Sequence, residues 1–198
     1  MGDLNGATAF SKLNLNQGFY QLDLAPQSHY ITTFSTNLGL MRYKRLNFGI
    51  SSTAEVFQNA IRDTLEGIKG AINISNDILV FGNGQQEHNR ALKAVLKQLR
   101  ERGLTLNQAK CDFNKPSLEF LGYVFGENGM SPDPKKVKDI LNLKSPTSVT
   151  EVRSLLGMTN YVSRFIKGYS TITQPLRLLT QKANHGTGPR IMTMLSIS

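Results

Sequence analysis

The chain has 198 residues, enough to bury a hydrophobic core in one domain or in two small ones. No apolar run approaches the ~20 residues that a membrane span requires, and Met1 to Ala9 lacks the pattern of a signal peptide. The single cysteine, Cys111, excludes an internal disulfide. A cytoplasmic or nuclear localisation is therefore expected.

The formal charge of +9 is unevenly distributed along the chain. Residues 1–130 contain 13 Lys and Arg against 11 Asp and Glu, whereas residues 131–198 contain 10 against 3. A basic C-terminal segment favours a polyanionic partner, with nucleic acid first. The alternative is an ordinary basic surface that is solvated.

A β-hairpin and a helix are predicted in the first part of the chain. Residues 30–36 are rich in β-branched and aromatic types, residues 40–46 alternate, and Asn37-Leu38-Gly39 lies between them. Ser51 or Ser52 then begins a helix that ends near Gly67. The predicted apolar face of that helix consists of Val56, Phe57, Ile61 and Leu65.

Two apolar strands meeting at the polar turn Asn76-Asp77 are predicted next, over residues 70–81. A second helix is predicted over residues 86–102, with Gly103 as its C-terminal stop. Residues 104–106 and 118–125 are predicted as strands. The expected apolar stripe of the second helix consists of Leu92, Val95, Leu96 and Leu99.

The composition changes at Ser131, and the remaining chain is predicted to be helical. Asp133 followed by Pro134 is typical of a helix start. Ser148 and Glu151 form a capping-box pattern. Apolar residues follow it at helical spacing, namely Val152, Leu155, Leu156, Val162 and Ile166. We therefore expect a core at 1–130, a helical subdomain at 131–182 and a disordered tail at 183–198.

The order of predicted elements is helix, strand, hairpin, helix, hairpin, helix, strands and a helical appendix. That order indicates an α+β fold, in which an antiparallel sheet carries helices on one face. His29, His88 and His185 lack metal-binding spacing and are expected at the surface. Periodicity alone does not indicate a reaction.

Six short motifs follow one another in a fixed order over about residues 4–181. They are Phe10-Ser11-Lys12-Leu13-Asn14-Leu15, Arg45-Leu46-Asn47-Phe48-Gly49-Ile50, Ile74-Ser75-Asn76-Asp77-Ile78-Leu79, Gly103-Leu104-Thr105-Leu106-Asn107, Phe120-Leu121-Gly122-Tyr123 and Val152-Arg153-Ser154-Leu155-Leu156-Gly157-Met158. In this order they resemble the reverse transcriptase domain of Ty3/gypsy-type retrotransposon Pol polyproteins. The resemblance implies a polymerase palm at 1–130 and a helical thumb and connection subdomain after it, with the fingers largely absent.

The resemblance also implies template-directed DNA synthesis by two-metal phosphoryl transfer. The family uses three Asp side chains, and the matching positions are Asn14, Asn76 and Asp77. Asp77 and the backbone carbonyl of Leu15 are the implied metal ligands. Mg²⁺ prefers anionic oxygens, whereas an Asn side chain offers one neutral acceptor. Binding of Mg²⁺ or Mn²⁺ is therefore expected to be weak or absent, and synthesis impaired. As an alternative, both asparagines are ordinary turn or strand-end residues.

Other roles carry over from the family to single positions. Phe19 would close over the 2′ position of the sugar, and Phe48 and Gly49 would lie against the incoming nucleotide. Lys110 would donate a proton to pyrophosphate, the alternative being a surface lysine beside Cys111. Four residues would grip the primer end or merely form a buried hairpin, namely Phe120, Leu121, Gly122 and Tyr123.

Two functions are compatible with the sequence. The first is an impaired reverse transcriptase domain, whose family partners are an RNA or DNA template-primer, deoxynucleoside triphosphates and the rest of a Pol polyprotein. The second is a non-catalytic nucleic-acid-binding or protein-interaction module derived from a retroelement. The basic C-terminal segment is compatible with both.

Overall fold

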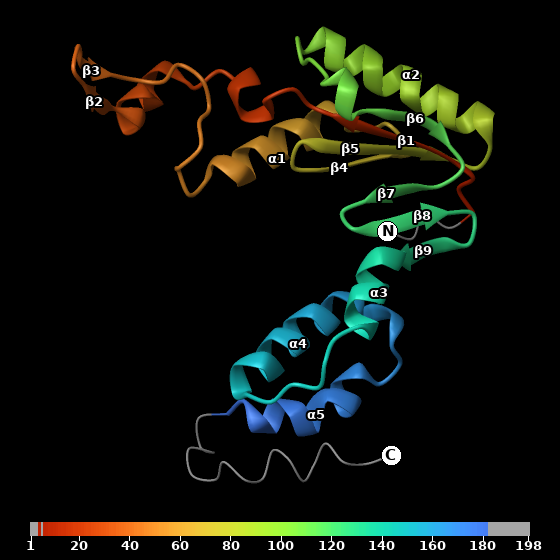
Figure 1. The fold of residues 1–198 in the computed structure, drawn as a ribbon. Coiled ribbons are helices and arrows are strands. Elements are labelled where there is room, and N and C mark those ends of the chain that lie inside the picture. The colour runs from red at the N-terminus through yellow and green to blue at the C-terminus, as the bar shows by residue number, and fades with distance from the viewer. Residues whose placement is uncertain (1–3, 5, 182–198) are drawn as a thin grey trace. The chain divides into compact units, whose positions relative to one another are not determined.

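The computed structural model describes residue 4 and residues 6–181 (Figure 1). The chain divides into two compact units, Met1–Met130 and Ser131–Ser198. The tail expected at 183–198 lies outside the described residues. Within the described part of the chain, no helix combines the length and apolar character that crossing a membrane requires.

A four-stranded antiparallel sheet forms the first layer of the first unit, in the order β4-β5-β1-β6. β1 pairs with β5 from Ala9↔Gly82 to Asn14↔Asp77, and β4 meets β5 at the turn Ser75-Asn76. The strands are β1 (Ala9–Asn14), β4 (Ala71–Ile74), β5 (Asp77–Gly82) and β6 (Asp112–Lys115). The predicted hairpin at residues 70–81 is confirmed. β6 was not predicted, because its residues are exposed and show no apolar alternation.

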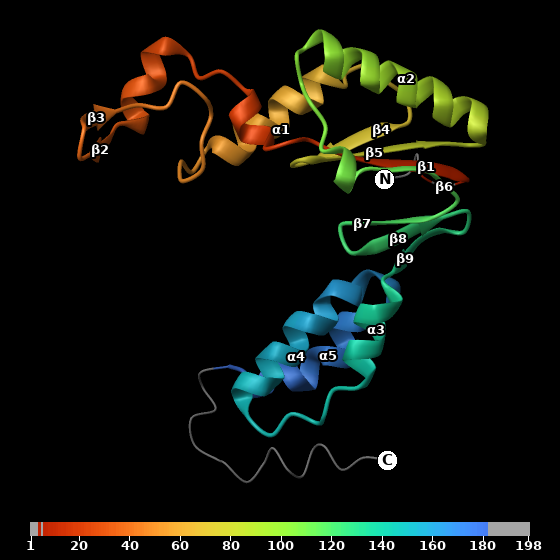
Figure 2. The same ribbon diagram turned by 45° about the horizontal axis from the view of Figure 1, so that its top comes forward.

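Two helices cover one face of this sheet, as Figures 1 and 2 show. α1 spans Thr53–Thr64 and α2 spans Gln85–Glu101, so both predicted helices are confirmed. Leu13 of β1 and Ile78 of β5 pack in one hydrophobic cluster with the inner faces of the helices. The helix residues buried in that cluster are Phe57, Ile61, Ala91, Val95 and Leu99.

Two residues assigned to the apolar faces of the helices are in fact exposed. Val56 and Leu96 each lie next to a buried position, Phe57 and Val95. One residue is a rotation of about 100° around a helix, so a neighbour of a core position falls outside the buried stripe.

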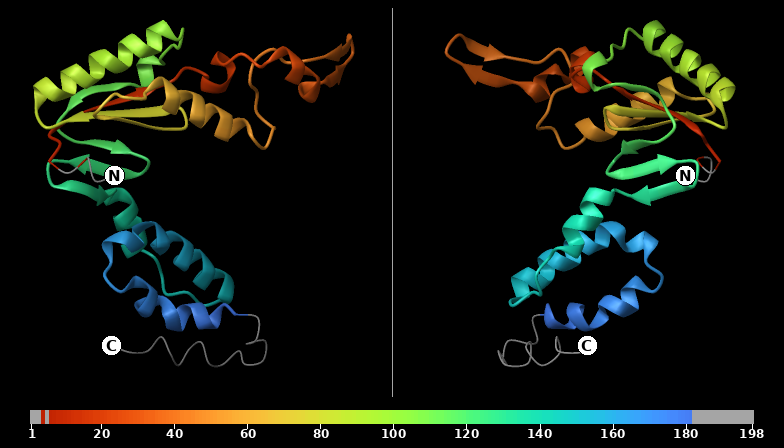
Figure 3. Two further views of the ribbon diagram at one scale, coloured as in Figure 1. Left: turned by 180° about the vertical axis from the view of Figure 1, so that it is seen from behind. Right: turned by 45° about the vertical axis from the view of Figure 1, so that its right-hand side comes forward.

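A three-stranded sheet, in the order β7-β8-β9, covers the opposite face of the four-stranded sheet (Figure 3). Phe10 of β1 and Leu79 and Phe81 of β5 pack there against Phe120 and Phe125. The strands are β7 (Leu118–Phe120), β8 (Tyr123–Gly126) and β9 (Gly129–Pro132). Because both faces of β5 are buried, its sequence is a nearly continuous apolar run. The fold of the first unit is therefore α+β, as predicted.

The first hairpin is shorter than predicted. β2 (Phe34–Thr36) pairs with β3 (Gly39–Met41), whereas Pro26–Thr32 forms a 3₁₀ helix. Pro26 fixes a helical φ, and the Thr32 hydroxyl donates to the carbonyl of His29 over 2.7 Å. These local bonds replace strand pairing at residues 30–33.

Two smaller expectations are wrong, and two short helices were not predicted. The first helix in the predicted order is absent from the described residues, where β1 is the first regular element. Residues 104–106 form only an isolated bridge, Leu15↔Leu106, instead of a strand. Short 3₁₀ helices occur at Gly18–Gln21 and Gln108–Lys110.

His88 was expected at the surface but is fully buried on α2. Its Nε2 lies 2.9 Å from Ser11 Oγ of β1, which also accepts a hydrogen bond from Asn114 N over 3.1 Å. Position 88 precedes Ala91 and Val95 on the buried stripe, so the helical period, and not the residue type, determines its environment. His29 is half-buried, and His185 lies outside the described residues.

The second unit contains α3 (Pro134–Leu141), α4 (Val149–Val162), the 3₁₀ helix Ser163–Phe165 and α5 (Tyr169–Leu179). Both predicted starts are confirmed by their caps. Asp133 Oδ1 accepts from Lys135 N over 2.9 Å, and Ser148 Oγ accepts from Glu151 N over 3.2 Å. Ile166 lies beyond α4 and is exposed, because the 3₁₀ helix changes the periodicity.

Candidate functional site

Asn14 and Asp77 lie side by side at one end of the four-stranded sheet. Asn14 is the last residue of β1, Asp77 is the first of β5, and the two are direct cross-strand partners. Asn14 Nδ2 donates a hydrogen bond to Asp77 Oδ1 over 2.7 Å. An ionised carboxylate only accepts hydrogen bonds, which requires the amide nitrogen, and not the amide oxygen, to face it. The clustering expected from the motifs is thus observed for this pair.

Backbone hydrogen bonds hold this end of the sheet in place. Asn14 O accepts a hydrogen bond from Asn107 N over 2.8 Å, and Asn14 N donates one to Cys111 Sγ over 3.4 Å. Leu15 N donates to Asn76 O over 2.8 Å, which ties β1 to the turn between β4 and β5. The Leu15 side chain is buried in the helix-covered core.

Gln58 of α1 fixes the turn that carries Asn76. Ser75 N donates to Gln58 Oε1 over 2.8 Å, and Gln58 Nε2 donates to Asn73 O over 3.0 Å. Ser75 has φ 53°, a left-handed conformation that costs a non-glycine residue about 1–3 kcal/mol. No role for Gln58 was predicted from the sequence, because the contact joins residues 17 positions apart.

Asn76 belongs to the same turn, but its side chain lies in a different environment. Its Oδ1 is buried and accepts no hydrogen bond among the described residues. Gly18 lies beside it, and a Cβ atom on Gly18 would overlap both Asn76 Oδ1 and Phe57 Cζ. Gly18 is therefore required at this position for steric reasons.

Three aromatic side chains form a group close to Gly18. The Phe19 ring packs edge-to-face on Phe57, with centroids 5.0 Å apart, and on Phe48, at 4.7 Å. Phe48 is 62% exposed, and Gly49 follows it with φ 92°, as a turn glycine. Phe19 lies in the 3₁₀ helix Gly18–Gln21. Its packing in the core is observed, and this packing is compatible with the role implied for it.

The Phe120–Tyr123 segment is a tight hairpin between β7 and β8. Phe120 pairs with Tyr123 and is buried against Phe10 of the large sheet. Leu121 and Gly122 have φ 54° and 79°, the positive values of a type I′ turn. By strand alternation Asn14 shares the face of β1 that carries Phe10, which is the face that this hairpin covers.

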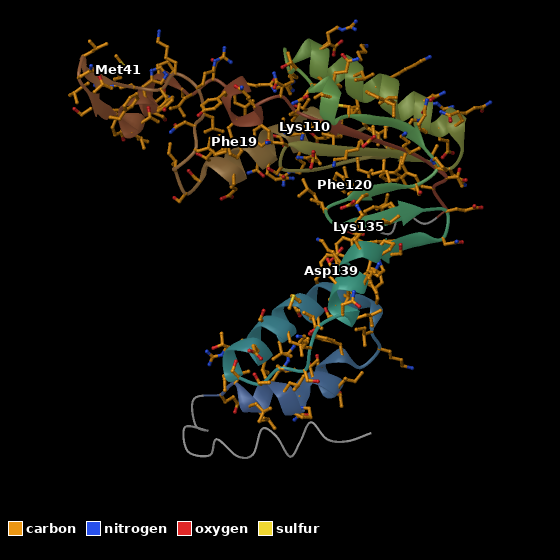
Figure 4. The ribbon with its side chains drawn as sticks, in the orientation of Figure 1. Phe19, Met41, Lys110, Phe120, Lys135 and Asp139 are labelled. Atoms are coloured by element: carbon orange, nitrogen blue, oxygen red, sulfur yellow. The ribbon has the colours of Figure 1, made fainter. Side chains whose placement is uncertain are left out.

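Among the described residues, Lys110 and Asp23 make no hydrogen bond or ion pair with Asn14 or Asp77. Figure 4 labels Lys110 and Phe19 near the end of the sheet where β4 turns into β5. Lys110 is exposed at the end of the 3₁₀ helix Gln108–Lys110. The Asp23 side chain is 81% exposed and pairs with Arg45 over 3.1 Å, so it is a solvated carboxylate.

The residues at this site do not fit a pair of divalent cations. Asp77 is the one carboxylate among the three matched positions, and its Oδ1 already accepts from the Asn14 amide. Two dications need several anionic oxygens to balance their charge. Within residues 4 and 6–181, no three His, Cys, Asp or Glu side chains are grouped so that they could hold a metal ion.

Comparison with known sequences identifies the family. The family model described as reverse transcriptase (RNA-dependent DNA polymerase) matches residues 1–125. The chain is 36% identical over 183 residues to the retrovirus-related Pol polyprotein from transposon opus and 34% identical over 178 residues to that from transposon gypsy, both of Drosophila melanogaster. It is 30% identical over 184 residues to the transposon Tf2-3 polyprotein of Schizosaccharomyces pombe. These matches cover 91%, 89% and 92% of the chain but only 18%, 17% and 14% of the polyproteins.

Solved structures with the same fold include two complexes of the foamy viral protease-reverse transcriptase. The dRH form in complex with double-stranded DNA gives a TM-score of 0.78 at 27% identity, and the complex with an RNA/DNA hybrid gives 0.76 at 26%. Each match covers 87% of this chain, and 30% and 24% of the viral chains. The chain therefore belongs to the reverse transcriptase family, as a reverse transcriptase-like domain of the Ty3/gypsy-type retrotransposon Pol polyproteins.

Proposed function

We propose that this domain does not carry out DNA synthesis at an appreciable rate, although it keeps the reverse transcriptase fold. The observation that supports the proposal is the hydrogen bond from Asn14 Nδ2 to Asp77 Oδ1. It occupies an oxygen that a metal ion would need, and it comes from a position where the family has a carboxylate. Asn76, the second such position, adds no negative charge.

The expected loss of rate is large. Loss of one group that stabilises developing charge typically costs ~10²–10³ in rate. Here two of three anionic metal ligands are replaced, and protein catalysis of phosphoryl transfer consists almost entirely of positioning and electrostatic stabilisation. We expect extension below the detection limit of an ordinary primer-extension assay.

Primer extension with Mg²⁺ or Mn²⁺ tests this proposal. The chain and its Asp77→Ala variant should give the same background, because no working metal site is left to remove. An active reverse transcriptase in parallel reactions shows that template, primer and nucleotides are competent. Extension by the unchanged chain that Asp77→Ala abolishes would contradict the proposal.

A second candidate function is binding of a template-primer duplex without catalysis. The viral relatives are in complex with DNA or an RNA/DNA hybrid. Residues 131–181 carry eight Lys and Arg against three Asp and Glu, and all eight basic side chains are exposed. We propose that they contact the phosphate backbone. In such a complex the primer end would meet the hairpin Phe120, Leu121, Gly122 and Tyr123, and a nucleotide would meet Phe19, Phe48 and Gly49.

A further inference from the structure

We propose that the two asparagines turn the former metal site into a metal-independent clamp, so that the first unit is equally stable with and without divalent cations. This inference rests on the proposed function in one respect: in both, Asn14 and Asn76 do not act as metal ligands for catalysis. It adds a role for the site that remains, which is to hold β1, β5 and their turn together.

Asn14 supplies the first part of the clamp. The ends of β1 and β5 bring its side chain and that of Asp77 within hydrogen-bond distance, 2.7 Å between Nδ2 and Oδ1. Two carboxylates at this separation would repel each other and would need a cation between them. The amide changes this repulsion into a charge-assisted hydrogen bond, which needs no cation.

Asn76 contributes through its neutrality and not through a hydrogen bond of its side-chain oxygen. That Oδ1 is buried beside Gly18 and has no donor among the described residues. A carboxylate in the same place would be a desolvated negative charge without a partner, which is far costlier than an unpaired amide oxygen. A neutral side chain at position 76 therefore allows the turn to pack against α1 without a metal ion.

Thermal unfolding with EDTA, Mg²⁺ or Mn²⁺ at matched ionic strength tests the inference. The variants are Asn14→Asp and Asn76→Asp, each of which restores one carboxylate with almost no change in shape. Asn16→Asp is the matched control, because Asn16 is exposed two residues beyond Asn14 and, among residues 4 and 6–181, only its backbone makes hydrogen bonds. Binding of Mn²⁺ is followed separately by electron paramagnetic resonance.

The unchanged chain and Asn16→Asp should melt at the same temperature in EDTA and in Mn²⁺. Asn14→Asp should melt lower in EDTA, by roughly 4 °C or more, and Mn²⁺ should restore most of the loss. The inference is overturned if Mn²⁺ raises the melting temperature of the unchanged chain as much as that of Asn14→Asp, or if Asn14→Asp melts like Asn16→Asp in EDTA.

Failure of a variant to fold does not remove the test. Should Asn14→Asp or Asn76→Asp be unfolded in EDTA, folding on addition of Mn²⁺ would support the inference. For the unchanged chain, Mn²⁺ binding that Asp77→Asn abolishes would overturn it. Because primer extension is not part of this experiment, its outcome is independent of the test of the proposed function.

Discussion

At the scale of single residues, the buried hydroxyl of Ser11 connects three elements of the first unit. The β1–β6 pairing shifts between Phe10 and Lys12, and Asn114 opposite this shift has φ 52°. A bulge leaves a backbone amide unpaired in the ladder. Ser11 Oγ accepts that hydrogen bond from Asn114 N and also bonds His88 Nε2, so one hydroxyl joins β1, β6 and α2.

Replacing Ser11 by Ala should destabilise the first unit by about 1–3 kcal/mol, the cost of one unsatisfied buried group. The change leaves the buried His88 Nε2 without this partner, whereas Asn114 lies on an exposed strand, where water can replace the hydrogen bond to its amide. Urea unfolding at neutral pH measures the difference. Ser35→Ala, the same change at an exposed position of β2, should stay within ~0.5 kcal/mol. Equal losses for the two variants would show that the buried hydroxyl has no special role.

At the scale of elements, helix α4 depends on a cap made by side chains close in sequence. Ser148 accepts from Glu151 N, while the Glu151 carboxylate accepts from Thr147 N over 2.6 Å and from Thr147 Oγ1 over 3.0 Å. These two hydrogen bonds from Thr147 lower the pKa of the Glu151 carboxyl from its ordinary value of 4.5, and the backbone bond has the larger effect. The negative charge also lies at the positive end of the helix dipole.

The second unit should therefore lose stability in acid through Glu151. A carboxyl whose pKa is lower in the folded state stabilises the fold above its ordinary pKa, and this contribution disappears as the pH falls through the folded-state value. Melting temperatures of the second unit between pH 3 and pH 7 should fall more steeply below about pH 4.5 for the unchanged chain than for Glu151→Gln. Asp139→Asn, which removes an exposed carboxylate of α3, is the control (Figure 4). Identical pH profiles for the chain and Glu151→Gln would contradict this.

The same local character explains which elements the sequence predicts. The caps at Asp133 and Ser148 and the stripe of α2 depend on residues a few positions apart, so patterns of spacing detect them. The Gln58–Ser75 bond and the burial of His88 against Ser11 join residues 17 and 77 positions apart. Neither leaves a local pattern, and the Asn14–Asp77 pair was predictable only through the family motifs.

At the scale of the whole molecule, the two units differ in their balance of basic and acidic residues. Residues 1–130 have nearly balanced charges, whereas the described residues from 131 onward have eight basic side chains, all exposed, against three acidic ones. Lys136 Nζ lies 4.4 Å from the centroid of the Tyr161 ring, and Arg153 donates to Thr180 O over 3.0 Å. Those two side chains support the packing of the helices, which leaves Lys138 and Lys144 as the better positions for testing charge alone.

Binding of a template-primer duplex should depend on salt through the second unit. Each neutralised phosphate contributes about −0.9 to the slope of log K against log salt. Replacing Lys138 and Lys144 by Gln should lower affinity at 50 mM salt and reduce the slope by roughly one for each lysine in contact. Lys93→Gln with Lys97→Gln, two exposed lysines of α2, removes the same net charge from the first unit and should change the slope far less. Fluorescence anisotropy with labelled DNA and RNA/DNA duplexes measures both. An equal loss of affinity in the two double variants would show that binding depends on net charge and not on the second unit. An affinity that does not change with salt would show that phosphate contacts do not cause the binding.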